Sequence, residues 1–186
     1  MKITRAGKEF NLNVNQLFDG NAYSDIYAAL VVARDGKNPK ECKHGGYTFK
    51  KLGAGVFRTV YAVFFSGIDT NIVVKVAKNK TKTRSNCYEY ANYLTACEHG
   101  FEYLLAPVLA LVERGVALFM EKASSIVTRG QMTHTELKKE LGFYVEPRKV
   151  HKKHYNPKCN TVLDIHYGNV VGGLIIDYGQ PLKMVY

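Results

Sequence analysis

The chain has 186 residues, of which 46% are hydrophobic and 23% are charged, so it is long enough to bury one sizeable core in one domain of two lobes. No apolar run approaches the roughly 18 residues of a membrane span, and residues 1–9 lack the apolar centre of a signal peptide. The four cysteines form no C-x-x-C pair, which suits reduced thiols in a cytosol. We therefore expect a cytoplasmic protein without a membrane segment.

Positive charge is concentrated in two stretches of the chain. The formal net charge is +10 at pH 7, and lysine and arginine cluster in residues 78–84 and 148–158. Such clusters are typical of surfaces that bind nucleic acid, ATP or an acidic protein. Lysine-rich runs more often only keep loops solvated. Charge alone therefore leaves the partner open.

The first 46 residues contain one helical pattern. Ser24 is a candidate N-cap, and apolar residues recur at helical spacing over residues 25–34, before Gly36. Residues 38–46, which contain Asn-Pro and Gly-Gly, are typical of a loop. We therefore predict a helical N-terminal extension over residues 1–46.

Short strands begin at residue 47. Apolar runs over residues 47–52 and 60–65 flank Gly53-Ala54-Gly55, and the β-rich sequence after the glycines favours a hairpin over the start of a helix. Glycine lets a phosphate approach the backbone closely, although most Gly-x-Gly pairs are ordinary turns. This segment is a candidate phosphate-binding hairpin.

A lysine lies inside the next predicted strand, residues 72–77. Lys75 is flanked by valines, and burying its ammonium there is unfavourable unless it meets an anion. The alternative is an edge strand, in which the side chain would point to water. The sequence leaves both possibilities open.

A helix over residues 86–99 follows, with Ser85 as its candidate cap and Gly100 at its end. Glu89 lies one turn inside this helix and is a candidate partner for Lys75. Glu98 competes for that role, but it lies in the last turn, where the helix dipole disfavours an acid.

Two further apolar runs, residues 107–112 and 116–121, complete a predicted small lobe of five strands and one main helix. After it, Thr133-His-Thr-Glu136 is a capping box that opens a helix over residues 136–141. Several candidate metal ligands match no zinc pattern, namely His151, His154 and Cys159, with Cys42 and His44 as distant recruits.

Residues 161–179 carry the strongest chemical signal. Gly172-Gly173, between two short β-rich runs, predicts a two-residue hairpin turn with Asn169 at its entry and Asp177 at its exit. Asp164 precedes Asn169 by five residues. A carboxylate can orient an acceptor hydroxyl and take its proton, and Mg²⁺ prefers oxygen ligands. These residues therefore predict a phosphoryl-transfer site.

The order of these elements resembles that of protein kinases. The matching residues are Leu52-Gly53-Ala54-Gly55, Val60-Tyr61, Lys75 among valines, helical Glu89, Met120-Glu121, Asp164-Ile-His166-Tyr-Gly-Asn169 and Asp177-Tyr-Gly179. Over residues 47–179 the chain thus resembles the protein-kinase-like fold. Its catalytic loop is similar to that of aminoglycoside phosphotransferases and of small phage-encoded serine/threonine protein kinases.

This resemblance implies an α+β fold with two lobes. The N-lobe, residues 47–123, would hold a five-stranded antiparallel sheet and one main helix. A truncated, mostly helical C-lobe over residues 124–186 would carry the catalytic loop and the metal-binding hairpin.

The resemblance also implies that ATP is bound, with the residues Gly53, Gly55, Val60, Lys75 and Glu121. Gly53 and Gly55 would cover the phosphates, and Lys75 would bind the α- and β-phosphates. Glu121 would border the adenine.

Catalysis is implied for four residues, Lys75, Glu89, Asp164 and His166. Glu89 would hold Lys75 in place. Asp164 would accept the proton of the acceptor hydroxyl, and His166, where protein kinases carry a lysine, would face the γ-phosphate. Asn169 and Asp177 would hold Mg²⁺.

The chain departs from the kinase pattern at several places. Arg58 replaces the third glycine of the hairpin, and Val162-Leu163 stand where His-Arg would precede the catalytic aspartate. Nine residues, 178–186, follow Asp177, so we expect no activation segment, no Ala-Pro-Glu element and no later helices.

We therefore expect a minimal serine/threonine protein kinase that depends on Mg-ATP and can phosphorylate itself. We expect it to act on host proteins in the host cytoplasm during phage infection. One alternative is a kinase-like binding module without catalysis that engages a host protein or nucleic acid through the two basic clusters. Another is a small-molecule phosphotransferase, although little chain remains for a substrate-enclosing lobe.

Overall fold

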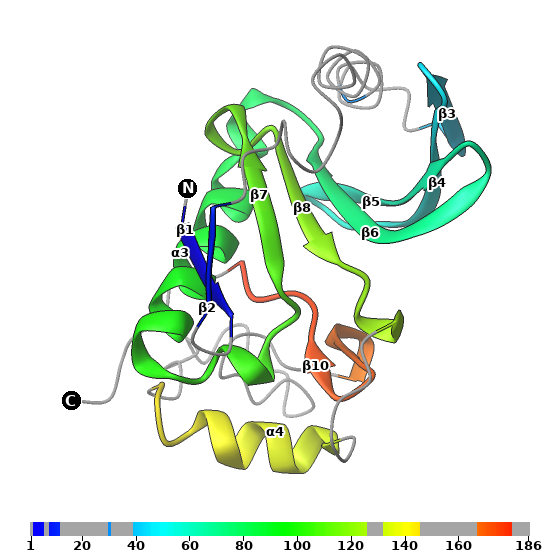
Figure 1. The fold of residues 1–186 in the computed structure, drawn as a ribbon. Helices are drawn as coiled ribbons and strands as arrows, with labels where there is room; N and C mark the ends of the chain where they lie inside the picture. The colour runs from blue at the N-terminus through cyan, green and yellow to red at the C-terminus, as the bar shows by residue number, and fades with distance from the viewer. Residues whose placement is uncertain are drawn as a thin grey trace. The chain divides into compact units, whose positions relative to one another are not determined.

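The structure, a computed structural model, describes residues 2–5, 8–11, 30, 39–125, 132–145 and 167–179. Within these residues the fold is α+β, with a mostly antiparallel sheet and two α-helices (Figure 1). The chain divides into two compact units, a first unit of Met1–Cys87 with Val108–Lys122 and a second unit of Tyr88–Pro107 with Ala123–Tyr186. The domain boundaries expected after residues 46 and 123 stay predictions.

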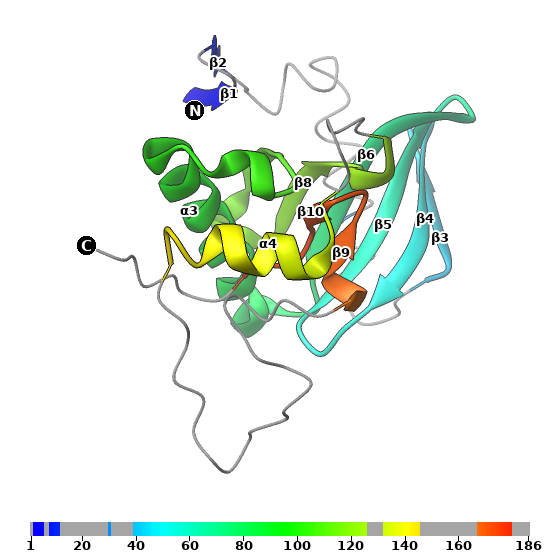
Figure 2. The ribbon, with the colours of Figure 1, turned by 90° about the horizontal axis from the view of Figure 1, so that it is seen from below.

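The first unit is built on a six-stranded sheet in the order β3-β4-β5-β6-β8-β7, and every neighbouring pair is antiparallel. Its strands are β3 (Glu41–His44), β4 (Tyr47–Ala54), β5 (Arg58–Phe65), β6 (Ile68–Ala77), β7 (Val108–Val112) and β8 (Ala117–Glu121). Figure 2 shows β3, β4 and β5 side by side. A separate hairpin pairs β1 (Lys2–Arg5) with β2 (Lys8–Asn11). All five predicted strands are confirmed.

The sixth strand, β3, corrects the predicted five-stranded sheet. The sequence predicts a loop over residues 38–46, but β3 pairs with β4 across a turn at Gly45-Gly46, where φ is 53° and 84°. Of the β3 side chains whose burial is described, Cys42 is buried, while Glu41 and Lys43 are exposed and form an ion pair at 2.8 Å. One apolar residue, Cys42, in a four-residue strand is too weak a sequence pattern to predict.

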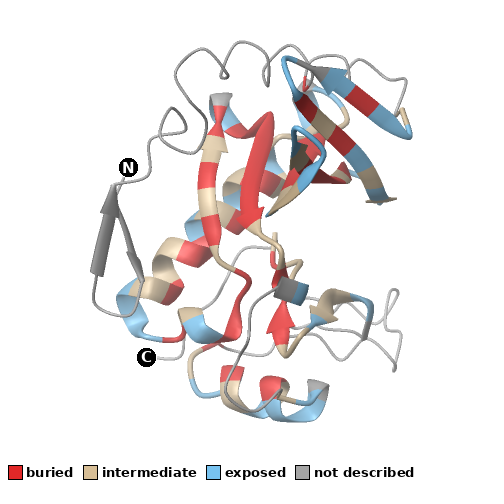
Figure 3. Ribbon diagram, turned by 45° about the vertical axis from the view of Figure 1, so that its right-hand side comes forward, coloured by how far each residue is buried: buried red, intermediate tan, exposed pale blue. Residues whose placement is uncertain are grey.

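The core of the first unit lies along the central strands. Buried residues, red in Figure 3, follow the sheet and include Phe49, Tyr61, Val63, Val74, Val76 and Phe119. Leu30, which is helical, joins this core, whereas the rest of the helix predicted over residues 25–34 lies outside the described residues. No helix in the described part of the chain is long and apolar enough to cross a membrane.

The long helix α3 (Arg84–His99) confirms the helix predicted at residues 86–99. Its start corrects the predicted cap, because Ser85 lies inside the first turn and the carbonyl of Thr83 accepts the N–H groups of Asn86 and Cys87. Gly100, with φ at 76°, ends the helix as expected.

The second helix, α4 (His134–Leu141), begins with the predicted capping box. Thr133 Oγ1 accepts the Glu136 N–H at 3.3 Å, and Glu136 Oε2 accepts the Thr133 N–H at 2.7 Å. Leu137 and Leu141 are buried on one face. Four consecutive residues are enough to predict this pair of hydrogen bonds, because a capping box forms within the first turn of its helix.

The predicted C-terminal hairpin is also confirmed. β9 (Val170–Val171) pairs with β10 (Leu174–Ile175), and Gly172-Gly173 makes the turn with φ at 58° and 77°. A parallel bridge joins Leu105 to Ile175, and the Ala106 N–H donates to the Ile175 carbonyl at 2.9 Å. The hairpin is therefore tied to the segment that precedes β7.

Candidate functional site

The glycine-rich hairpin between β4 and β5 leaves its backbone open. Gly53 pairs with Val60, and the Gly55 N–H donates to the Arg58 carbonyl at 2.9 Å, which closes the turn. Among the described residues, apart from the two chain neighbours of each glycine, no atom lies within 4 Å of the position that a Cβ would occupy on Gly53 or Gly55. A ligand could therefore approach this backbone closely. Gly55 would contribute space for the ligand and no hydrogen bond, because its N–H already donates to the Arg58 carbonyl.

Three of the predicted nucleotide-binding residues lie in one row across the sheet. Val60 on β5 pairs with Gly53 on β4 and with Lys75 on β6. Directly paired residues in an antiparallel sheet project from the same face and lie about 5 Å apart. The Lys75 side chain and the open space beside Gly53 therefore share one face, with Val60 between them.

Lys75 lies on an interior strand. It pairs with Val60 on one side and Leu118 on the other, and it is only 5% exposed. The edge-strand alternative is therefore wrong, because both neighbours of β6 are present. Its charge is held away from water, where an ammonium is stable only with polar partners or an anion.

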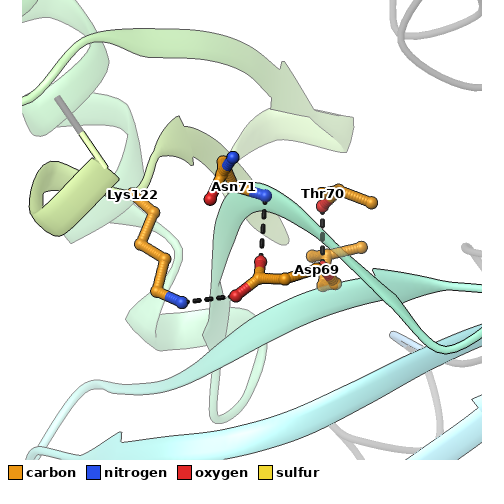
Figure 4. A network of polar contacts seen from close by, with 5 residues as sticks. Asp69, Thr70, Asn71 and Lys122 are labelled. Atoms are coloured by element: carbon orange, nitrogen blue, oxygen red, sulfur yellow. Dashed lines mark hydrogen bonds and ion pairs between the residues drawn. The ribbon is translucent and has the colours of Figure 1, made fainter.

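The end of β8, which carries Glu121, is held by a polar network on the first unit (Figure 4). Lys122 Nζ donates to Asp69 Oδ2 at 2.6 Å, and the Asn71 N–H donates to Asp69 Oδ1 at 2.9 Å. The Lys122 N–H in turn donates to the Asn71 carbonyl at 2.8 Å. The hydrogen bond from Lys122 lowers the pKa of Asp69, so the network favours the charged form of this carboxylate.

On the second unit, Asn169 and Asp177 lie at the open end of the β9–β10 hairpin. The Ile176 N–H donates to the Asn169 carbonyl at 2.8 Å, which extends the ladder by one pair beyond β10. Asp177 follows directly, so the two predicted metal-binding residues are neighbours, and both are half-buried. The hairpin geometry expected from Gly172-Gly173 is confirmed.

Tyr178, in the Asp177-Tyr-Gly179 segment, is anchored by three hydrogen bonds. Its N–H donates to Glu89 Oε1 at 3.4 Å, its carbonyl accepts from Asn92 Nδ2, and its hydroxyl donates to the Ala106 carbonyl. Tyr178 and Glu89 are 0% exposed. The residue beside Asp177 is thereby fixed to helix α3.

Sequence reasoning missed the anchoring roles of Asn92 and Tyr178. Glu89 and Asn92 are three residues apart, so they lie on one face of α3, with Tyr93 and Ala96 also buried on this helix. Two buried polar residues at this spacing are the signal that could have indicated a tertiary partner. The sequence gives no indication of which segment that partner is.

The donors at the hairpin suit a hard cation. Asn169 and Asp177 offer an amide and a carboxylate oxygen, which are ligands that Mg²⁺ accepts. Among the described residues no group of three or more His, Cys, Asp or Glu side chains could hold a metal ion. The amide and carboxylate oxygens of Asn169 and Asp177 fit Mg²⁺, which proteins usually bind through one or two side chains together with substrate phosphates.

Several predicted residues cannot be placed. Asp164 and His166 lie outside the described residues, as do His151, His154, Cys159 and the basic stretch 148–158. Lys75 and Glu89 belong to different units. Their pairing, and the catalytic role of Asp164, stay predictions.

Comparison with known proteins adds no relative. No family model, curated protein or solved structure matches the chain.

Proposed function

We propose that the chain is an Mg-ATP-dependent phosphotransferase with a protein-kinase-like fold, and that it acts as a minimal serine/threonine protein kinase. The observation that carries this proposal is the row of Gly53, Val60 and Lys75 across three strands. A cationic side chain and an open glycine backbone on one face of the sheet suit a polyphosphate, because ammonium groups form strong charge-assisted hydrogen bonds with phosphate oxygens.

The described residues have distinct tasks in this reaction. Lys75 would bind the α- and β-phosphate oxygens, while Gly53 and Gly55 leave room for them. Val60 would support the base and sugar, with Glu121 at the strand end beside the adenine. All of these tasks are positioning and charge neutralisation, which account for most of phosphoryl-transfer catalysis.

The second set of residues would serve the transferred phosphate. Mg²⁺ supplies charge neutralisation at the phosphate oxygens, and Asn169 and Asp177 would hold it. Asp164 would accept the proton of the attacking hydroxyl as the new P–O bond forms and the bond to the ADP oxygen breaks. The hydrogen bonds of Tyr178 hold the main chain directly after Asp177.

The proposal is tested by incubating purified protein with Mg²⁺ and γ-labelled ATP. We expect label in protein hydroxyls from the wild type and none from Lys75→Met. Lys50→Met, which removes an exposed lysine that lies 4.6 Å from the Phe64 ring centroid, is the matched control and should label normally. Equal labelling by Lys75→Met would contradict the proposal, and label only in added small molecules would favour a small-molecule phosphotransferase.

The resemblance to phage-encoded kinases extends the proposal to the acceptor. A host protein in the host cytoplasm would receive the phosphate. Labelling of proteins in a bacterial lysate by wild type and not by Lys75→Met would support this extension.

A second candidate function is a binding module for an acidic partner, a host protein or a nucleic acid. Between residues 42 and 88 the chain holds nine lysines and arginines and one acid, Asp69, which is paired with Lys122. At the hairpin tip Val56 is 75% exposed and Phe57 is 43% exposed, and Lys82 lies 4.9 Å from the Phe57 ring centroid. Exposed aromatic and cationic groups together suit stacking and phosphate contacts.

This second candidate has its own test. Binding of a labelled single-stranded oligonucleotide should weaken steeply with salt and should be lost in a Lys78→Gln, Lys82→Gln double variant. If the Lys75→Met variant still binds the oligonucleotide, this binding does not depend on the ATP site. Binding that does not respond to the double variant would exclude this surface.

A further inference from the structure

Arg58 is buried at the base of the glycine-rich hairpin, where the kinase pattern has a third glycine. It is 7% exposed and pairs with Ala77 at the end of β6. Residues two apart on a strand share a face, so Arg58 projects from the same face as Val60 and Lys75. A second cation therefore lies beside the row proposed to bind phosphate.

The guanidinium of Arg58 is directed to helix α3. Its Nη1 donates to Asn86 Oδ1 at 3.2 Å, and Asn86 is 0% exposed. Asn86 Nδ2 donates to the Lys75 carbonyl at 3.0 Å and to the Gly115 carbonyl at 2.8 Å. Both the amide oxygen and the amide nitrogen of Asn86 are thus used, and one buried side chain joins β5, β6 and the turn before β8.

The surroundings leave Asn86 little freedom. Gly115 has φ at 95°, and a Cβ there would lie 2.5 Å from the Thr83 carbonyl oxygen and 2.7 Å from Cys87 Sγ. The Cys87 thiol also donates to the Arg114 carbonyl at 3.3 Å. The turn before β8 is therefore pressed against the first turn of α3, which fixes where Asn86 can donate.

We propose that Arg58 is a positioning residue for nucleotide binding, which acts through Asn86 to hold the Lys75 main chain and the β5 side of the glycine-rich hairpin in one arrangement. This inference rests on the proposed function. A glycine at position 58 would leave the buried Asn86 oxygen without its charged donor and would free β5 from α3. Where the kinase pattern has a flexible third glycine, this chain thus has Arg58, whose hydrogen bond to Asn86 holds the hairpin base in place.

The test measures ADP binding by calorimetry in the presence of Mg²⁺, so that phosphoryl transfer is not needed. Arg58→Gly should bind ADP about tenfold more weakly, the size expected when a charged buried hydrogen bond is lost. Arg58→Lys keeps a charged donor and should recover part of the affinity. If Arg58→Gly does not fold, Arg58→Met, which has similar length and no donor, replaces it.

Two controls separate positioning from other roles. Lys43→Gln removes one charge from a side chain that is 71% exposed, and it should leave ADP affinity unchanged. Asn86→Ser should weaken binding as Arg58→Gly does, and the double variant should be no weaker than either, because both remove one network. In a transfer assay KM for ATP should rise while kcat at saturating ATP is unchanged.

The outcomes are distinguishable. ADP binding by Arg58→Gly as tight as that of the wild type would overturn the inference and leave the proposed function standing. Additive losses in the double variant would also overturn it, since Arg58 would then act directly on the nucleotide. Absence of ADP binding by the wild type would overturn the proposed function and this inference together.

Discussion

Lys75 carries its charge on a strand with neighbours on both sides. Burying an ammonium is unfavourable unless polar groups or an anion surround it, so the buried position of Lys75 supports the phosphate-binding role that we propose for it. The sequence could predict that Lys75 lies in a strand, because valines surround it. It could not predict that the strand is interior, because this depends on β8, more than forty residues later in the chain.

At the same scale, Asp69 gives a pH-dependent prediction. Its pKa is lowered in the folded protein by the hydrogen bond from Lys122, so its stabilising contribution is present above the unfolded pKa of about 4 and is lost as pH falls through the lower folded value. Lys122→Met should reduce the free energy of unfolding at pH 7 by less than about 1 kcal/mol, since the pair is partly exposed.

This difference between wild type and Lys122→Met should shrink as pH falls below about 4. Urea unfolding at pH 7 and pH 3 measures it. A difference that is the same at both pH values would show that Lys122 acts through packing and not through the charge of Asp69.

At the scale of elements, the two glycine turns have opposite requirements. Gly53 has open space at its Cβ position, whereas Gly172 has φ at 58° and a Cβ there would lie 2.9 Å from the Ala123 carbonyl oxygen. Gly172→Ala should therefore lower the free energy of unfolding by about 1–2 kcal/mol. Gly53→Ala should leave the free energy of unfolding within about 0.5 kcal/mol and should weaken ADP binding by filling the open space at the glycine backbone.

Chemical denaturation and ADP titration of both variants test this contrast. If the glycine-rich hairpin binds phosphate as proposed, Gly53→Ala must bind ADP more weakly while its free energy of unfolding stays unchanged. If Gly53→Ala binds ADP normally, the open space beside this glycine is not where phosphate lies.

The Tyr178 anchor gives a second prediction for an element. Tyr178→Phe removes the hydroxyl that donates to the Ala106 carbonyl in a fully buried position, so it should lower the free energy of unfolding by about 1 kcal/mol. Tyr88→Phe, at a residue that is 40% exposed, is the matched control and should have no effect. Equal stability of both variants would show that this hydrogen bond does not support the segment.

Elements with local signals were predictable from the sequence. The capping box at Thr133 and the Gly172-Gly173 turn depend on adjacent residues, and the five predicted strands have clear apolar runs. β3 was not predictable because Cys42 is the one apolar residue in its sequence. The network of Arg58 and Asn86 joins residues 28 positions apart, so no local pattern could indicate it.

At the scale of the whole molecule, the two units interleave along the chain. Tyr88–Pro107 of the second unit is inserted between the two segments of the first. The residues proposed for the nucleotide belong to the first unit, and Asn169 and Asp177 belong to the second. The kinase order of motifs predicts which residues belong to each set, because it orders residues along the chain. It could not predict their hydrogen bonds, which depend on tertiary packing.

The measurement that tests the central claim most directly is the Mg²⁺-dependent rate of phosphate transfer from γ-labelled ATP by wild type and Asp177→Asn. Glu98→Gln, which neutralises an exposed carboxylate on α3, is the control, and the folding of each protein is checked by circular dichroism. We predict that the wild type and Glu98→Gln label protein at the same rate, and that Asp177→Asn is at least about a hundredfold slower. Transfer by folded Asp177→Asn at the wild-type rate would contradict the account.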